Sequence, residues 1–589
     1  MHWKRFAWLV AVLAMAGCAQ HTPSQTVVAQ PADMILTNAM VYTLDDRQPW
    51  AEAVAIAKDR IAFVGTAAEA RKLVDAKTQV MDLQGRTVMP GFISAHDHLV
   101  SSDYLAYGVH IYEARTIEAA LALIKAYADA NPHEKIIRGI GWTMSNFGRY
   151  PTAAELDRAV PDRPAIILDY TIHDAWLNTK AMQTAGIDRN TPDTQPGTAF
   201  WVRDAAGNPT GVALEGEWMA PYVAVGAWEP ERMIRESTLR QFAIAASHGT
   251  TTVQDPGLMT PNLMNCTGMK ADFRIGLAVL SELDRRGELP LRAQVMPFFK
   301  APDCDPAQVA DFAVAMKALH DSDTLRVRSI KIHPAANMES YGTPLIEPYA
   351  DKPTRGHFGV APETIAQVVL EANRRDIDIV MHAWGDAEVR AGIDAFEQAR
   401  KAGLGKARNV LHHLGLVHPD DYQRLVRLKI PLNVTPVFST DWTGQHLTYI
   451  RLLGEKRALA ELAVYPDLVR AGLNLSISSD MPSSGPAEAQ APLYNVEAAV
   501  TLRTPLDGEA SQPFPPGRQG LSVAQALRAI TIDAAWQLRM EDRIGSLETG
   551  KYADVVILEK NPFDVAPTQI SEIKVLGTLK GGKFTHRAF

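Results

Sequence analysis

The sequence lacks an excess of positive charge. Its 59 lysine and arginine residues are outnumbered by 67 aspartate and glutamate residues, which gives a formal net charge of -8. The chain also has no run of lysine or arginine that could follow a phosphate backbone. We therefore exclude a nucleic-acid partner and expect a small-molecule substrate for a chain whose 47% apolar composition is typical of a globular protein.

Cysteine is scarce as well, with three in 589 residues. Cys18 belongs to a targeting segment, so Cys266 and Cys304 form an even pair in the rest of the chain. An oxidising compartment permits a disulfide between them, but spacing alone cannot show that their Cβ atoms meet. A disulfide and two unrelated buried thiols both stay open.

The first residues are typical of an export signal. Lys4 and Arg5 give a basic start, and an apolar stretch and small residues lead to Cys18. This ending resembles a bacterial lipobox, which implies that residues 1–17 are removed and that lipid is attached to Cys18. The alternative is an ordinary secretory signal with an incidental cysteine.

Residues 18–32 are rich in Gln, Thr, Pro and Ala and are expected to form a flexible tether. By resemblance to Gram-negative lipoproteins, Ala19 after the cysteine indicates the outer membrane. We expect a protein of the cell envelope that faces the periplasm and contacts the membrane only through its lipid anchor. The sequence leaves open whether the chain forms a homodimer.

Both ends of the remaining chain are rich in β-strand patterns broken by turns. Residues 33–90 lack a helical period, and residues 545–589 contain a strand-like segment followed by a hairpin that turns at Gly581 and Gly582. Each piece is too small to bury a core of its own. We predict that the two pieces together form one small β-sandwich domain.

Between them, residues 91–544 alternate short apolar strands with amphipathic helices. This α/β pattern predicts a TIM-like (β/α)8 barrel, but the range is longer than the roughly 250 residues of a bare barrel. We therefore expect an inserted subdomain at about 100–245. That stretch includes Trp142 and four other tryptophans, which could line a substrate lid or form the core of the subdomain.

His96-Asp97-His98 is the most informative motif. It follows an apolar run, and residues i and i+2 of a strand point to the same face, so both imidazoles can reach one metal ion. A surface His-x-His on an edge strand is the alternative. His382, His413 and Asp480 lie at or near the ends of other predicted strands, where a βα barrel carries its catalytic groups.

Lys331 lies between apolar neighbours in a predicted strand, where an unpaired ammonium is costly to bury. Carboxylation of its amine would turn it into an anionic ligand that bridges two metals. Each of these residues has an ordinary alternative: a hydrogen-bonded core histidine, a helix cap at Asp480 or a snorkelling side chain at Lys331. Their coincidence at one rim favours a metal centre.

A set of motifs spread over most of the chain resembles the metal-dependent amidohydrolase superfamily, and specifically its amidohydrolase-3 branch of N-substituted formamide deformylase-like proteins. The motifs lie at residues 82–93, Gly141-Trp142, Leu156-Asp157, Asn178, residues 382–386, residues 479–482, residues 521–527 and residues 545–554. They run through nearly all of residues 34–586, so the resemblance covers the fold as a whole.

The resemblance implies a role for each candidate. It places His96 and His98 on a first metal, His382 and His413 on a second, carboxylated Lys331 between the metals, and Asp480 as a first-metal ligand and proton shuttle. Zinc suits these ligands best, as one or two ions, although iron or manganese could use them. The resemblance also assigns substrate contacts to His173 and Trp142, and a structural histidine is the alternative for His173.

Two departures from the family pattern stand out. The family commonly follows the strand lysine with Asp-Gly, where this chain has Ala336-Asn337, and it commonly places Glu before the strand-six histidine, where this chain has His412. The second departure leaves a choice of ligand. We select His413 from the residues that follow it, and we expect strand alternation to turn only one of the two histidines inward.

We expect a hydrolase that cleaves an amide, N-acyl or cyclic amide bond other than a peptide bond, because Asp480 beside the metals can accept a proton from water and return it to the leaving nitrogen. A deaminase or an ester or lactone hydrolase could use the same site. The alternative from another class is a non-catalytic binding or regulatory lipoprotein. Metal content distinguishes it, because a retired site should bind no metal.

Overall fold

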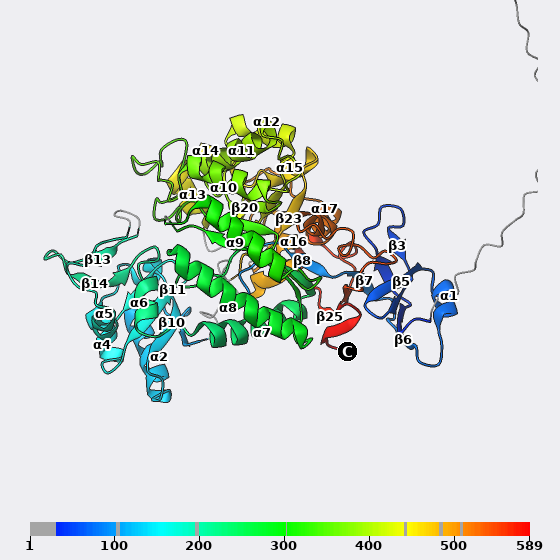
Figure 1. The fold of residues 1–589 in the computed structure, drawn as a ribbon, viewed down its shortest axis with the longest axis horizontal. Helices are drawn as coiled ribbons and strands as arrows, with labels where there is room; N and C mark the ends of the chain where they lie inside the picture. The colour runs from blue at the N-terminus through cyan, green and yellow to red at the C-terminus, as the bar shows by residue number, and fades with distance from the viewer. Residues whose placement is uncertain are drawn as a thin grey trace, which may run out of the picture.

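The structure is a computed structural model that describes residues 31–101, 107–194, 199–301, 303–440, 445–481, 487–506 and 511–589. The predicted signal segment and Cys18 lie outside the described residues. Within the described ranges, no helix combines the length and apolarity needed to cross a bilayer. Figure 1 shows the terminal strands at the right, a central body of strands and helices, and a separate group of elements from β9 to α6 at the lower left.

Strands from both ends of the chain meet in one six-stranded sheet, in the order β26-β25-β24-β7-β2-β3. Its members are β2 (Met40–Tyr42), β3 (Trp50–Ala51), β7 (Thr87–Pro90), β24 (Val555–Leu558), β25 (Val575–Lys580) and β26 (Lys583–Arg587). Because β24 pairs with β7 in antiparallel register, backbone hydrogen bonds join the two ends of the chain.

A second sheet of four strands, in the order β5-β4-β1-β6, lies beside the first. Its members are β1 (Met34–Thr37), β4 (Ala53–Ala57), β5 (Arg60–Gly65) and β6 (Gln79–Asp82), and α1 (Ala67–Ala70) follows β5. Val54 of this sheet and Ile557 of the six-stranded sheet belong to the same buried cluster. The two sheets therefore share one apolar core, which neither could bury alone.

Parallel strands build the central body as two sheets, in the orders β18-β16-β15-β8 and β17-β19-β20-β21-β22-β23. Their bounds are β8 (Phe92–Ser94), β15 (Thr250–Asp255), β16 (Arg292–Val295), β17 (Phe298–Phe299), β18 (Leu325–Arg326), β19 (Ser329–Ile332), β20 (Asp378–His382), β21 (Val410–His412), β22 (Leu432–Val434) and β23 (Leu475–Ile477). The chain passes from the first sheet to the second twice, between β16 and β17 and between β18 and β19.

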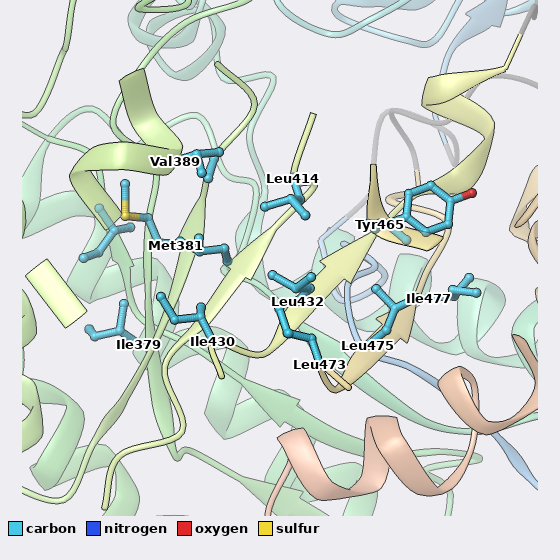
Figure 2. Close-up of a cluster of buried hydrophobic side chains, with 14 of the residues drawn as sticks. Ile379, Met381, Val389, Leu414, Ile430, Leu432, Tyr465, Leu473, Leu475 and Ile477 are labelled. Carbon is cyan, nitrogen blue, oxygen red and sulfur yellow. The ribbon is translucent and has the colours of Figure 1, made fainter. Parts of the chain in front are cut away.

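Helices alternate with these parallel strands, as the sequence predicts. The main ones are α7 (Pro230–Ser247), α8 (Cys266–Arg285), α9 (Pro306–Leu319), α10 (Pro362–Arg374), α11 (Asp386–Lys401) and α12 (Pro419–Leu428). The predicted apolar face of α10 is confirmed, since Ile365 and Val368 are buried. Figure 2 shows Val389 of α11 near Met381 of β20, in a core that continues through Leu432 to Leu475.

Shorter helices complete the central body and the C-terminal region. They are α13 (Gln445–Leu453), α14 (Glu455–Glu461), α15 (Tyr465–Arg470), α16 (Pro492–Thr501), α17 (Val523–Ala529) and α18 (Ile532–Gln537), with single turns of 3-10 helix at Arg71–Leu73, Pro436–Ser439, Ala487–Gln490 and Pro567–Gln569.

A separate six-stranded sheet, β13-β14-β12-β11-β10-β9, lies within the range expected for the insertion. Its elements are β9 (Val109–His110), α2 (Ile117–Ala130), β10 (Ile137–Trp142), α3 (Met144–Phe147), α4 (Ala153–Ala159), β11 (Ala165–Asp169), β12 (Ala175–Leu177), α5 (Thr179–Ala185), β13 (Trp201–Arg203), β14 (Pro209–Ala213) and α6 (Met219–Ala224). Helix α7 also falls in that range, but it packs against α8 and β15 of the central body. Trp142 and Trp176 are buried in the core beside this sheet.

Candidate functional site

The His96-Asp97-His98 motif begins immediately beyond the end of β8 and its backbone is tied to the segment after β23. The Asp480 N–H donates to the His96 carbonyl oxygen at 3.0 Å, and the His98 N–H donates to the Met481 carbonyl oxygen at 2.8 Å. The buried Asp97 carboxylate accepts from the Ser479 hydroxyl at 2.5 Å and from the Met481 N–H at 3.1 Å. These bonds fix the two histidines beside Asp480.

His96, His98 and Asp480 form a compact group of three buried metal-binding side chains. The ligand atoms lie within 4.8 Å of one another. Asp480 Oδ1 lies 3.1 Å from His96 Nε2 and 3.6 Å from His98 Nε2. Asp480 adopts a left-handed backbone conformation, with a φ of 56°, which is uncommon for a residue other than glycine and typical of functional positions.

Lys331 reaches the same group from β19. The side chains of Ile330 and Ile332 belong to the apolar core, so strand alternation turns Lys331 to the opposite face, where its Nζ lies 3.4 Å from His96 Nε2. Burial lowers the pKa of Lys331, although the neighbouring Asp480 carboxylate opposes this shift. Burial raises the pKa of Asp480 in turn, against the charge of Lys331.

Three more histidines surround this group. His382, at the end of β20, has its ring centroid 4.5 Å from that of His413 and 4.2 Å from that of His333. His413 lies one residue beyond β21 with a φ of 72°, so strand alternation no longer determines its direction. The centroids of His412 and His413 both lie 4.5 Å from that of His96.

The left-handed conformation at His413 brings the rings of both neighbouring histidines close to His96, which strand alternation alone would not do. The two rings nevertheless differ in position. His413 lines the cavity described below together with His382, whereas His412 is fully buried behind it.

The donor atoms of this group suit a divalent metal. Within the described residues, His412 Nε2, His413 Nδ1, His333 Nδ1 and Asp480 Oδ1 are buried without a hydrogen bond, which is costly for polar atoms unless another group satisfies them. Burial lowers the pKa of His98 to about 3 and that of His96 well below its usual value, which keeps these imidazoles neutral. Neutral imidazole and carboxylate oxygen are ligands that zinc and related ions bind.

A cavity of about 830 Å³ opens onto the group and fits a small molecule rather than a polymer. The metal-site candidates His96, His98, Lys331, His382, His413 and Asp480 all line it. His173 and Trp142, the residues expected to contact substrate, line the cavity as well. Trp142 is almost fully buried and its Nε1 donates to the Ile167 carbonyl oxygen at 2.9 Å, so it has a structural role as well.

Three further residues of the cavity wall escaped the sequence analysis: Glu215, Lys300 and His333. Lys300 and His333 directly follow β17 and β19, so the strand-end rule that selected His382 could have found them. Glu215 lies in a loop of the insertion and carries no such signal. Its carboxylate accepts from His173 Nδ1 at 2.8 Å.

The Cys266–Cys304 pairing left open by the sequence is a disulfide, with the two Cα atoms 5.1 Å apart. It joins the first residue of α8 to the segment before α9. Leu263 and Met264 before one cysteine, and Lys300 before the other, line the cavity. The disulfide therefore links two segments that each contribute residues to the cavity wall.

Known proteins with the same organisation identify the family. The model of the amidohydrolase family matches residues 79–586. An N-substituted formamide deformylase from Arthrobacter pascens is 26% identical over 576 residues, which cover 94% of this chain and 98% of that protein. A crystal structure of an uncharacterised metal-dependent hydrolase from Pyrococcus horikoshii is 23% identical, with a TM-score of 0.72, and covers 91% of this chain and 99% of that one.

A zinc complex of atrazine chlorohydrolase TrzN from Arthrobacter aurescens shares the fold at 14% identity, with a TM-score of 0.52 and coverage of 94% of this chain and 95% of that one. The family's structures imply a TIM-like barrel for the central body. The resemblance read from the motifs is confirmed, and the protein is a hydrolase of carbon–nitrogen bonds other than peptide bonds. The chain belongs to the amidohydrolase family.

Proposed function

We propose that the protein hydrolyses an amide, N-acyl or cyclic amide bond of a small molecule at a zinc site built by His96, His98, Lys331, His382, His413 and Asp480. The observation that carries this proposal is the Asp480 carboxylate, which is buried within 3.6 Å of both histidines of the first motif and has an oxygen without a hydrogen bond.

We also infer that the parallel sheets form a closed (β/α)8 barrel and that the terminal sheets form a sandwich.

Bound zinc, as one or two ions, would lower the pKa of water and polarise the scissile carbonyl. Asp480 accepts the proton of the attacking water and returns it to the leaving nitrogen, because its carboxylate faces the cavity among the ligands. His173 lies in the cavity wall, held by Glu215, and is oriented to hydrogen-bond a substrate oxygen.

The test is a screen of the zinc-loaded protein against formamides, N-acyl amino acids, cyclic amides and lactones. Release of amine or acid from an amide, absent in His96→Ala, supports the proposal. Turnover of lactones alone would instead indicate the ester or lactone hydrolase alternative. Metal analysis distinguishes a binding protein, because a retired site should bind no zinc.

Lys331 is proposed to be carboxylated and to bridge two ions, because its Nζ is buried 3.4 Å from His96 Nε2 among donor atoms that lack partners. Lys331→Ala should lose at least 10²-fold in turnover, and a short carboxylic acid added with zinc should restore part of it by occupying the vacated place. Unchanged zinc content and turnover in Lys331→Ala would show that the lysine only fills space.

We further propose that the chain is a lipoprotein of the outer membrane, anchored through Cys18 and facing the periplasm. The support is the apolar stretch that ends in small residues at Cys18. In cells labelled with a radioactive fatty acid, the full chain should incorporate label and fractionate with membranes. A Cys18→Ser variant that is labelled to the same extent would contradict the proposal.

A further inference from the structure

The cavity holds a second charged group beside the candidate metal centre, formed by Lys300, His173 and Glu215. Lys300 directly follows β17 of the central body, whereas His173 and Glu215 come from loops of the inserted part. The mechanism above gives no role to Lys300. Three charged side chains from distant parts of the chain thus converge on one wall of the cavity.

Glu215 has its hydrogen-bonding capacity occupied by neighbours. Its Oε2 accepts from His173 Nδ1 at 2.8 Å, and its Oε1 accepts from the Ser340 hydroxyl at 3.0 Å and from the Asn337 N–H at 3.4 Å. Burial opposes the charge of His173, but the Glu215 carboxylate outweighs burial and raises the pKa of His173 to about 9. His173 is thus a cation whose Nε2–H is left for another acceptor in the cavity.

The Lys300 ammonium has no hydrogen-bond acceptor among the described residues, although it is half-buried. Burial lowers the pKa of Lys300, and the acids that oppose this shift are Glu215, which is shared with His173, and Glu388. Burial raises the pKa of Glu388 to about 8, and the Gly385 and Trp384 N–H groups that donate to its Oε2 oppose this shift. Lys300 therefore lacks a committed counter-charge.

Two further acids of the cavity, Asp169 and Asp174, have hydrogen-bond donors of their own. The Asp169 carboxylate accepts from the Thr171 N–H at 2.9 Å, the Thr171 hydroxyl at 2.6 Å and the Asp174 N–H at 2.8 Å. Asp174 accepts from the Glu215 N–H at 3.0 Å, and burial raises its pKa well above the usual value. Lys300 and His173 thus both line the cavity and share Glu215, the carboxylate that acts most strongly on each of them.

Lys300 also lies close to the reacting end of the cavity. Strand β17 pairs with β19 so that Phe299 is opposite Ile332, which places Lys300 next to His333 across the sheet. The ring of His333 stacks on that of His382, with centroids 4.2 Å apart. Adjacent strands are about 4.8 Å apart, so Lys300 begins one strand away from His333 and two strands away from His382.

We propose that Lys300 and His173 bind a carboxylate of the substrate, which assigns the protein to amides that carry a carboxylate close to the scissile bond, such as N-acyl amino acids. This inference rests on the proposed function, because it places the scissile amide at the metal centre. A carboxylate carries a negative charge, and it accepts hydrogen bonds from the lysine ammonium and the imidazole N–H together.

The test compares two probes with the zinc-loaded full chain. N-acetylphenylalanine, as either enantiomer, carries the carboxylate, and N-acetylphenethylamine differs from it only by lacking that group. The phenyl ring is chosen because Phe298, Trp384 and Phe438 line the same cavity. Binding is measured by calorimetry and turnover by release of acetate, in the wild type, Lys300→Met, Lys300→Arg and Lys180→Met. Lys180 is exposed on α5 and serves as the matched control.

We expect the wild type and Lys180→Met to bind one enantiomer of the acid at least about tenfold more tightly than the neutral amide, and Lys300→Met to lose that preference, since a hydrogen-bonded charge pair of about 1.5 kcal/mol corresponds to tenfold in affinity. Lys300→Arg should keep most of the preference because it keeps the charge. Thermal melting of each variant distinguishes a lost contact from a lost fold.

The outcomes separate this inference from the proposed function. If the acid binds through Lys300 but neither probe is hydrolysed, the carboxylate site stands and the proposed hydrolysis of N-acyl compounds fails. If the neutral amide is hydrolysed and bound as well as the acid, the hydrolysis stands and the carboxylate site is wrong. Equal preference in the wild type and Lys300→Met, or no binding of either probe, also overturns the inference.

Discussion

At the scale of single residues, Asp480 combines an unusual backbone conformation with an unusual environment. Its φ of 56° is one that asparagine and aspartate tolerate better than other side chains, and its carboxylate is buried between His96 and His98. Both the left-handed backbone and the buried Oδ1 without a hydrogen bond are energetically unfavourable. Such strain is typical of functional positions, and here it is consistent with a carboxylate held ready for a ligand.

Replacing Asp480 by asparagine separates proton transfer from shape. Asp480→Asn keeps an oxygen donor and suits the left-handed backbone, but it cannot accept the proton of water. We expect turnover to fall by more than about 10²-fold with little change in KM. Zinc content, measured by atomic emission, is the control. A variant that retains zinc and hydrolyses its substrate at a near-native rate would exclude Asp480 as the proton shuttle, and His173 would be tested next.

The two adjacent histidines allow a comparison within one site. His413 lines the cavity with its Nδ1 unpartnered, whereas His412 is fully buried behind it in contact with His96. We expect His413→Asn to lower zinc content and to reduce turnover by at least about tenfold, because it removes a ligand. His412→Asn should keep more zinc than His413→Asn. If His412→Asn instead keeps less zinc than His413→Asn, His412 and not His413 is the ligand.

At the scale of elements, the Cys266–Cys304 disulfide connects the start of α8 to the segment before α9 across a separation of 38 residues. Closing a loop of this length removes conformational entropy from the unfolded chain and stabilises the native state by about 3–4 kcal/mol. We expect the Cys266→Ser, Cys304→Ser variant to lose about that free energy of unfolding in urea titrations. Wild-type protein unfolded in reductant should match the variant, and equal stability of oxidised and reduced wild type would contradict the prediction.

The elements also show what the sequence can and cannot reveal. His96, His382 and Asp480 were predictable because a strand has a period of two and parallel strands end at one face. The turn that brings both His412 and His413 to His96 was not predictable from the sequence, because the left-handed residue His413 after β21 interrupts the period of two. Glu215 was invisible because its partner His173 is distant in sequence, and the disulfide needed the packing of α8 and α9 before it could be assigned.

At the scale of the whole molecule, a buried ion pair joins the terminal sheets to the central body. Arg292 of β16 donates to both oxygens of Asp554, which immediately precedes β24, at 2.7 Å and 3.1 Å. The two side chains are 5% and 2% exposed, and the Gly581 N–H also donates to Asp554, at 2.7 Å. The pair therefore connects the C-terminal strands to β16, which is followed in the chain by β17 and Lys300.

Removing one member of this pair should cost far more than removing a surface ion pair. Arg292→Met leaves the Asp554 carboxylate buried with the Gly581 N–H as its remaining donor among the described residues, so we expect a loss of about 3–5 kcal/mol in the free energy of unfolding. The matched control is Arg528→Met, which loses an ion pair with Asp46, a residue that is 88% exposed, and a longer one with Asp533 at 3.5 Å, and this loss should cost about 0–1 kcal/mol. Both are measured by urea unfolding followed through tryptophan fluorescence.

The double variant Arg292→Met, Asp554→Leu identifies the cause of that loss. If the uncompensated buried charge of Asp554 is responsible, removing it in the same chain should restore part of the stability, because an apolar pair can fill the space that the ion pair occupied. No recovery would instead assign the cost to the packing of the guanidinium against the Tyr552 ring, which lies 3.9 Å from it. Equal, small losses in Arg292→Met and Arg528→Met would show that the terminal sheets are held by their shared strands alone.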